Sequence, residues 1–477
     1  MKRRQLLQSF SAPLLVPSAL SSFQGQSNKA KPNIVWIMAD DMGWGDPGCY
    51  GQKVIKTPNI DRLASEGTRF TDAYAGCTVC APSRSVLMTG MHMGHTSVRS
   101  NPGGVPLLDS DQTVAMYLKQ AGYRNGMFGK WGLGDIATDG VPWKKGFDEF
   151  CGFLHQVHAH YQYPEHLYFN DKLVQVPGNA NKQRGTYAND FMVDHGLRWL
   201  DKVGKSGPFF GYFPLTIPHW EPVVPEEELA PYASIPEAGP WIDKSDRLIS
   251  TQRPRATYAG MVARVDRYVG QILAKLKELG VAENTLVFFT SDNGGHFKGI
   301  DKEDYLKTNG PFRGYKTTMY EGGLRVPMIA RMPGRIPANR VSPYPWSFCD
   351  FLPTALATAG MEAPKGIDGF NVWPTLEGKS QPVHDTFYWE LPGYDGAKGV
   401  FHKEAPKAAL RQGDWKIVRP EPNAALELYN LKADIGETKN LAAAEPQRLS
   451  AMERLLLGTR TEPRSQRHGP HPWQQQS

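Results

Sequence analysis

Residues 33–41 read NIVWIMADD, a continuous apolar run that ends in Asp40 and Asp41. A short apolar run without polar alternation is typical of a strand that is buried on both faces, as in the middle of a parallel sheet. In open α/β sheets, ligands bind at the carboxyl ends of such strands. The two aspartates are therefore candidate oxygen ligands for a divalent cation at that edge, although a solvated turn would also tolerate two acids.

The same pattern recurs at residues 285–293, which read TLVFFTSDN and end in Asp292 and Asn293. Parallel neighbouring strands would bring both pairs of polar side chains to one edge of the sheet. Three carboxylates and one carboxamide are hard ligands. The site is therefore predicted to hold Ca²⁺, or less favourably Mg²⁺, in preference to zinc.

Residues 80–90 read CAPSRSVLMTG, which predicts a helix that starts close to a cysteine. Pro82 favours a first helical turn and Gly90 ends the helix, so Cys80 is expected at or near the N-terminus. Backbone donors and the helix dipole favour negative charge there, and Arg84 lies one turn further on. This geometry suits a nucleophile that faces an anion, whereas a lone cysteine before a helix is by default a buried structural residue.

The pattern Cys-x-Pro-Ser-Arg-x4-Thr-Gly resembles the signature of type I sulfatases, a family of the alkaline phosphatase superfamily. The resemblance implies that a formylglycine-generating maturation enzyme oxidises Cys80 to formylglycine (3-oxoalanine), whose hydrate is both the nucleophile and a metal ligand. It also implies that the other metal ligands are the side chains at the two strand ends. These are Asp40, Asp41, Asp292 and Asn293.

Three further positions match residues of that family that contact the sulfate or the leaving oxygen. Lys130 lies in the turn GKWGLG at residues 129–134, His219 lies between prolines after an apolar run, and Lys316 lies in a glycine-rich block at residues 310–327. The cation and the basic side chains would hold the sulfate oxygens, and His219 or Lys316 would assist the leaving alcohol. The predicted catalytic residues are Cys80, Arg84, Lys130, His219 and Lys316.

One position departs from the family pattern. Many members carry a histidine where this chain has Gly132, and that histidine assists the nucleophile. The segment at residues 146–164 contains His155, His158 and His160. Such spacing could hold a transition metal, but no regular helix or nearby cysteine pattern supports that interpretation. We interpret the segment as a loop that lines a polar substrate pocket, and as a candidate replacement for the missing histidine.

The expected fold is α/β, with a large, mixed, mostly parallel sheet flanked by helices (alkaline phosphatase-like) and a smaller C-terminal antiparallel sheet subdomain. We predict an export signal at residues 1–28, a catalytic domain at 29–378, an antiparallel subdomain at 379–460 and a disordered tail at 461–477. Helices are expected at residues 57–67, 111–122, 258–279 and 446–457, and strands at 69–74, 123–128, 208–213, 326–330, 387–389, 408–411, 415–418 and 426–429.

Composition and charge exclude some classes of function. The 477-residue chain has a net charge of +6 without a long basic run, so nucleic-acid binding is not indicated. After the first residues no apolar stretch is long enough to span a bilayer, so no transmembrane segment is expected in the mature chain.

The N-terminus resembles an export signal. Lys2-Arg3-Arg4 precedes a modestly apolar stretch at residues 6–23, which predicts export by a Sec or twin-arginine route to the periplasm or outside the cell. A disordered basic tail is the alternative.

Cysteine usage leaves the disulfides open. The chain has five cysteines. If Cys80 is reserved for chemistry, the pairing of Cys49, Cys77, Cys151 and Cys349 cannot be deduced.

We predict a sulfuric ester hydrolase that cleaves a sulfate monoester on a carbohydrate, so its partner would be a sulfated glycan or small molecule. Related enzymes share the nucleophile and the metal, which makes a phosphonate or phosphate ester hydrolase the second hypothesis. A third is a glycan-binding pseudoenzyme in which Cys80 is not converted.

Overall fold

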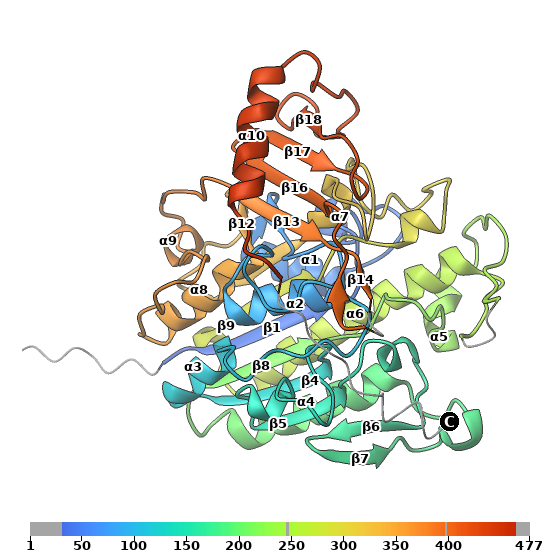
Figure 1. Ribbon diagram of the computed structural model, residues 1–477. Coiled ribbons are helices and arrows are strands. Elements are labelled where there is room, and N and C mark those ends of the chain that lie inside the picture. Colours follow the sequence, from blue (N-terminus) through green and yellow to red (C-terminus); the bar gives the residue numbers. More distant parts are fainter. Residues whose placement is uncertain (1–30, 245–247, 396–397, 464–477) are drawn as a thin grey trace, which may run out of the picture. The chain divides into compact units, whose positions relative to one another are not determined.

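The computed structural model describes residues 31–244, 248–395 and 398–463 (Figure 1). The predicted export signal at residues 1–28 therefore lies outside the described residues. A ten-stranded sheet has the order β11-β2-β10-β9-β1-β8-β4-β5-β6-β7. Its strands are β1 (Asn33–Ala39), β2 (Thr68–Phe70), β4 (Arg124–Lys130), β5 (Glu149–Phe153), β6 (His166–Phe169), β7 (Lys172–Gln175), β8 (Phe209–Pro214), β9 (Thr285–Ser291), β10 (Met328–Arg331) and β11 (Arg340–Ser342).

The middle of this sheet is parallel. β9, β1, β8, β4 and β5 are parallel neighbours, whereas β10 on one side and β6 on the other run antiparallel to β9 and β5. The register aligns Ala39 of β1 with Ser291 of β9, so the two strands end at the same level. The mixed, mostly parallel sheet expected from the sequence is confirmed.

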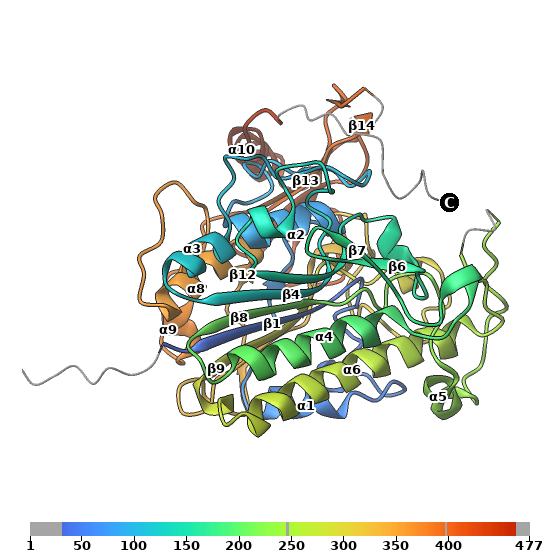
Figure 2. The same ribbon diagram turned by 90° about the horizontal axis from the view of Figure 1, so that it is seen from below.

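Helices cover both faces of the sheet (Figure 2). Alternate residues of β1 pack toward opposite faces: Trp36 and Met38 join one apolar cluster, and Val35 and Ile37 join the other. Burial on both sides explains why the run has no polar alternation. One face carries α2 (Cys80–Thr89), α3 (Val114–Gln120) and α8 (Phe351–Thr358), and the other carries α1 (Pro58–Ser65), α4 (Ala188–Val203) and α6 (Pro254–Glu278).

Several element boundaries differ from the prediction. α6 begins at Pro254 instead of residue 258, because proline suits a first helical turn. Residues 69–74 form two strands instead of one, since β2 joins the large sheet and β3 (Ala73–Tyr74) pairs with β12 (Trp346–Ser347). α2 begins at Cys80, so Pro82 lies within the first turn but not at its first position.

A four-stranded antiparallel sheet forms the C-terminal part, with α10 (Pro446–Gly458) lying along it (Figure 1). Leu410, Ile417 and Leu456 belong to the same apolar cluster as Trp36 of β1, so this sheet and the large sheet share a core. The domain boundary at residues 378/379 stays a prediction. The remaining elements are β13 (Phe387–Leu391), β14 (Tyr394–Asp395), β15 (Val400–Phe401), β16 (Lys407–Gln412), β17 (Trp415–Arg419), β18 (Glu427–Asn430), α5 (Glu226–Leu229), α7 (Glu321–Leu324) and α9 (Trp373–Leu376).

Buried ion pairs also join the C-terminal sheet to α7, the helix that precedes β10 in the chain. Nζ of Lys416, on β17, lies 2.8 Å from Glu321 of α7 and 2.9 Å from Glu437. All three side chains are fully buried. Glu321 is also paired with Arg325 (2.7 Å), so buried cations neutralise these carboxylates, which do not reach water.

The chain end is ordered further than the sequence predicts. Thr461, expected in a disordered tail, accepts a hydrogen bond from Nη1 of Arg99 (2.6 Å) and donates its N–H to Gly94 (3.0 Å). The tail from residue 464 lies outside the described residues.

Every cysteine lies in the described ranges, and all of them are free thiols. None of the helices in those ranges is both long and apolar enough to cross a membrane.

Candidate active site

The carboxyl ends of β1 and β9 bring four polar side chains together. Asp40 and Asp41 follow β1, and Asp292 and Asn293 follow β9. Oδ1 of Asp292 accepts a hydrogen bond from the backbone N–H of Asp41 (3.1 Å), and the Asn293 amide donates to Oδ1 of Asp41 (2.7 Å). All four residues are fully buried. The predicted metal ligands thus meet at one edge of the sheet.

This group fits a divalent cation. Oδ1 of Asn293 is buried and has no hydrogen-bond partner among the described residues, so it is free to act as a ligand. Asp41 has a φ of 65°, a conformation that is strained for a residue other than glycine and that is typical of functional sites. Three buried carboxylates repel one another unless cations neutralise them. The hard oxygen set suits Ca²⁺ or Mg²⁺.

Cys80 lies next to these acids. It is the first residue of α2, and its Sγ is 3.3 Å from Oδ1 of Asp40. Burial and the nearby carboxylates of Asp292 and Asp40 raise the pKa of the thiol well above its usual value. An unmodified Cys80 is therefore a poor nucleophile at neutral pH, despite its place at a helix N-terminus.

Two lysines add positive charge beside the acids. Lys130, the last residue of β4, places Nζ 2.7 Å from Oδ2 of Asp40, and Lys316 places Nζ 2.8 Å from Oδ2 of Asp41. The side chain of Lys130 is 1% exposed and that of Lys316 is 14% exposed. The site is therefore open to solvent on the side of Lys316.

Arg84 contacts the acids directly. Its Nε and Nη2 donate to Oδ2 of Asp292 (3.1 and 2.7 Å), and Nη1 donates to the backbone oxygen of Lys130 (2.5 Å). Nη2 also lies 3.5 Å from Asp40. The guanidinium is buried, and these contacts are all with the acids and with the backbone of β4.

Two histidines converge on one oxygen of Asp41. Nε2 of His219 lies 3.5 Å from Oδ2 of Asp41, and Nδ1 of His296 lies 3.2 Å from the same atom. Nδ1 of His219 donates to the backbone oxygen of Trp220 (2.6 Å), which directs Nε2 toward the site. His296 was not predicted, although its place in the glycine turn just after Asn293 was a signal for it.

The surrounding charges shift the pKa values of Asp41 and Asp292 in opposite directions. Burial alone would raise the pKa of Asp41, but Lys316 and the two histidines outweigh it and hold that pKa well below its usual value. Burial and the neighbouring Asp40 raise the pKa of Asp292 to about 6, against the opposing effect of Arg84. The edge of the sheet thus holds one firmly ionised carboxylate and one that depends on nearby positive charge.

The histidine-containing loop lies partly at the site. His160 stacks on His219, with ring centroids 4.5 Å apart. His158 instead packs against Phe153 and His166. No group of three metal-ligating side chains in the described part of the chain contains either histidine, so the structure does not support a transition-metal site there.

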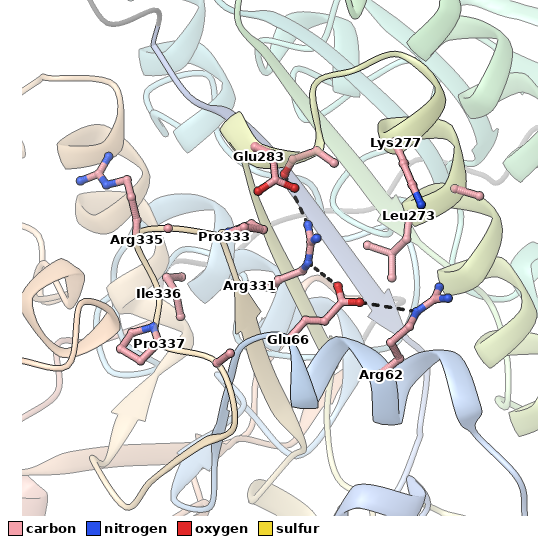
Figure 3. Close-up of a pocket in the computed structure, with 14 residues that line it drawn as sticks. Arg62, Glu66, Leu273, Lys277, Glu283, Arg331, Pro333, Arg335, Ile336 and Pro337 are labelled. Atoms are coloured by element: carbon pink, nitrogen blue, oxygen red, sulfur yellow. Dashed lines mark hydrogen bonds and ion pairs between the residues drawn. The ribbon is translucent and has the colours of Figure 1, made fainter.

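A cavity of about 950 Å³ lies at the other end of the strands (Figure 3). Within it, Arg331 is paired with Glu66 (2.8 Å) and Glu66 with Arg62 (4.0 Å). The cavity includes Glu283, which precedes β9, and the 7 residues of β9 separate it from Asp292 by about 20 Å. None of its lining residues is a histidine, cysteine or aspartate. It therefore has no part in the site around Cys80.

Comparisons with known proteins agree with this geometry. Residues 32–361 match the family model "Sulfatase", and residues 312–457 match the model "N-sulphoglucosamine sulphohydrolase, C-terminal". The chain is 35% identical to human N-acetylgalactosamine-6-sulfatase over 72% of its own length and 66% of that protein. It is 31% identical to rat arylsulfatase G over 91% of its length and 87% of that protein.

Solved structures share the fold. The structure of Ps i-CgsB in complex with k-i-k-neocarrahexaose superposes with a TM-score of 0.76 at 30% identity, covering 92% of this chain and 95% of that one. The chain therefore belongs to the type I sulfatases of the alkaline phosphatase superfamily, a family of sulfuric ester hydrolases.

Proposed function

We propose that this protein hydrolyses a sulfate monoester by means of a formylglycine formed from Cys80, with Ca²⁺ held by Asp40, Asp41, Asp292 and Asn293. The observation that carries the proposal is that these four oxygen ligands meet at one sheet edge, with Sγ of Cys80 at 3.3 Å from one of them. The roles of the individual residues belong to this proposal.

The acids and their supports would hold the cation. A bound divalent cation would supply a Lewis acid beside the reacting group. Asn293 offers its unpartnered oxygen, and Arg84 fixes the carboxylate of Asp292 with two donors. Such charge-assisted, two-donor contacts restrict geometry as well as stabilise charge.

The side chain at position 80 would supply the nucleophile. Hydrated formylglycine would offer one hydroxyl to attack sulfur and a second to release the product, which a thiol cannot do. Asp40 already accepts a hydrogen bond from Cys80, so it can orient the group at that position.

Lys130, Lys316 and His219 would act on the ester. A sulfate monoester carries its negative charge on non-bridging oxygens, and more charge develops on the leaving oxygen as the S–O bond breaks. The two ammonium groups flank the acids and suit the non-bridging oxygens. Lys316 and Nε2 of His219 lie on the more exposed side, where either can contact the leaving oxygen.

The proposed substrate is a sulfated carbohydrate. Two comparisons support this class: a relative named N-acetylgalactosamine-6-sulfatase and a structural neighbour solved with a neocarrahexaose. We also propose export to the periplasm or cell exterior, on the basis of the basic and apolar N-terminal sequence.

Comparing substrates tests the reaction class. Protein produced with a formylglycine-generating enzyme and loaded with Ca²⁺ is assayed for kcat/KM on 4-nitrophenyl sulfate, phosphate and phenylphosphonate esters, with Cys80→Ala as the matched control. We expect sulfate to be the preferred ester and Cys80→Ala to be inactive. Higher kcat/KM on a phosphate or phosphonate ester would reject sulfate hydrolysis. Binding of sulfated glycan without turnover, by protein that is made in its native host and has an unmodified Cys80 thiol, would indicate a pseudoenzyme.

A further inference from the structure

Gly132 leaves room for a side chain from another segment. It has a φ of +80°, and a Cβ atom at this position would lie 2.1 Å from Nε2 of Gln156 and 2.8 Å from its Cδ. The carboxamide of Gln156 therefore occupies the space in which a side chain at position 132 would begin. Gly132 belongs to the same turn as Lys130, so this carboxamide lies beside the turn that carries a buried ammonium group.

The residue before Gln156 contacts a loop that bonds to the start of the Cys80 helix. A Cβ atom at Gly103 would lie 2.7 Å from Cε1 of His155, so the two residues are in direct contact. In the same loop, Oδ1 of Asn101 accepts a hydrogen bond from the N–H of Ala81 (3.3 Å), in the first turn of α2. One end of the segment thus contacts the loop that bonds to the first turn of α2.

The residues after Gln156 reach the His219 loop. His160 stacks on His219, and its backbone oxygen accepts a hydrogen bond from the N–H of Glu221 (3.3 Å). Glu221 in turn accepts from the N–H of Gln162 (2.9 Å). The segment at residues 155–160 therefore contacts the Lys130 turn and the His219 loop, and it also contacts the loop whose Asn101 bonds to the Cys80 helix.

Gln156 is a buried donor without an acceptor. The residue is 3% exposed, and its Nε2 has no hydrogen-bond partner among the described residues. Burying an unpaired polar group is unfavourable, so such a group calls for a specific explanation. A carboxamide nitrogen only donates, and an anionic oxygen is the acceptor that such a donor binds most strongly.

We infer that Gln156 is a substrate-contacting residue whose Nε2 donates a hydrogen bond to the sulfate group, in the space that a side chain at position 132 would otherwise fill. The inference rests on the proposed sulfatase function and assigns a new residue to the same site. The ligand is the anion itself, so inorganic sulfate is a sufficient probe.

The first test uses Gln156→Ala and the isosteric Gln156→Glu in the converted, Ca²⁺-loaded protein. The inhibition constant for inorganic sulfate and kcat/KM for 4-nitrophenyl sulfate are measured with the melting temperature. Losing a hydrogen bond to a charged group predicts that Gln156→Ala weakens sulfate binding and lowers kcat/KM by about 10- to 100-fold. Gln156→Glu is expected to lose more, because it faces the anion with a carboxylate.

A merely structural role would give a different pattern, in which the melting temperature falls and the sulfate inhibition constant stays the same. That pattern, or changes below about threefold in both kinetic values, overturns the inference. If Gln156→Ala does not fold, Gln156→Glu preserves the shape. Its thermal stabilisation by added sulfate is then compared with that of the parent protein, and equal stabilisation also overturns the inference.

The second test asks whether the two residues share one space. Gly132→Ala should lower the stability of the folded protein for two reasons, the positive φ at this position and the collision with Gln156. Gly280→Ala is the control, because Gly280 has a φ of +72° and a Cβ atom there would have nothing within 4 Å. It therefore measures the loss of stability that comes from the positive φ alone. Adding Gln156→Ala to Gly132→Ala should remove the collision and leave the loss seen for Gly280→Ala. Simple additivity of the two changes would contradict the shared space.

These outcomes are separable from failure of the proposed function. If Cys80→Ala keeps its activity, the formylglycine mechanism fails. If Cys80→Ala is inactive while Gln156→Ala binds sulfate normally, only the role of Gln156 fails.

Discussion

Arg84 offers a quantitative test of how the acids are held. Its guanidinium donates twice to Asp292, lies 3.5 Å from Asp40 and is fully buried. Replacing it in Arg84→Met removes the positive charge and leaves two buried carboxylates next to each other. Breaking a buried ion pair in this way costs about 3–5 kcal/mol of unfolding free energy.

The expected change is measurable by calorimetry. Unfolding entropy scales with chain length, so for a chain of this size 1 kcal/mol corresponds to about 1 °C, and the metal-free variant should melt about 3–5 °C below the metal-free parent. Added Ca²⁺ should recover part of that loss, because the cation neutralises the same carboxylates. Activity should fall as well, since Asp292 loses the group that orients it.

Arg84→Lys is the control, because it keeps the charge and loses the two-donor geometry. It should lie between the parent and Arg84→Met in stability. The reasoning is refuted if Arg84→Met melts with the parent protein in the absence of metal, or if Ca²⁺ stabilises the two proteins equally.

Three further predictions concern the metal, acidity and the C-terminal sheet. Removing the metal with a chelator should abolish activity. In metal titrations, Asn293→Ala should need a Ca²⁺ concentration about tenfold higher or more to restore activity, and an unchanged Ca²⁺ concentration would exclude Asn293 as a ligand. Burial, and to a smaller extent His166, lowers the pKa of His158 to about 3. In the unfolded chain this histidine binds a proton near pH 6.5, whereas in the folded chain it stays neutral. The free energy of unfolding should therefore fall by about 2 kcal/mol between pH 7 and 5. His158→Phe should remove that part of the pH dependence in melting curves, and an identical pH profile would contradict it. Lys416→Met removes the cation paired with buried Glu437 and leaves Glu321 with Arg325 alone. The change should lower the unfolding free energy by about 3–5 kcal/mol in denaturant titrations without changing KM, and a loss below about 1 kcal/mol would refute this account of the ion pairs.

The sheet and the meeting of the acids could be predicted because they depend on local patterns. A run such as residues 33–39 is apolar at every position only if both faces are covered, and the polar residues that follow must then lie at the strand end. The parallel register then brings the two pairs of polar residues together, because it aligns the ends of β1 and β9. Asp40, Asp41, Asp292 and Asn293 are adjacent for that reason.

The parts of the site that could not be predicted from the sequence lie on loops whose course is set by tertiary packing. His296 and Gln156 lie on irregular segments. Such segments have no helical or strand periodicity in their sequence, so their course cannot be predicted from a hydrophobic pattern. The positive φ of Gly132 and the approach of Gln156 to it are long-range features that no short motif contains. Arg84 shows the same limit, because its motif predicted its position on α2 but not that Asp292 and Asp40 would occupy its donors.

The state of residue 80 is the most direct test of the account. Protein samples with different degrees of conversion are digested, the fraction of the Cys80 peptide that carries an aldehyde is measured by mass spectrometry, and kcat on 4-nitrophenyl sulfate is measured for each sample at saturating Ca²⁺. The account predicts that kcat rises in proportion to the aldehyde fraction and reaches zero when only thiol is present. Full activity in a sample whose Cys80 is entirely unmodified thiol would contradict it.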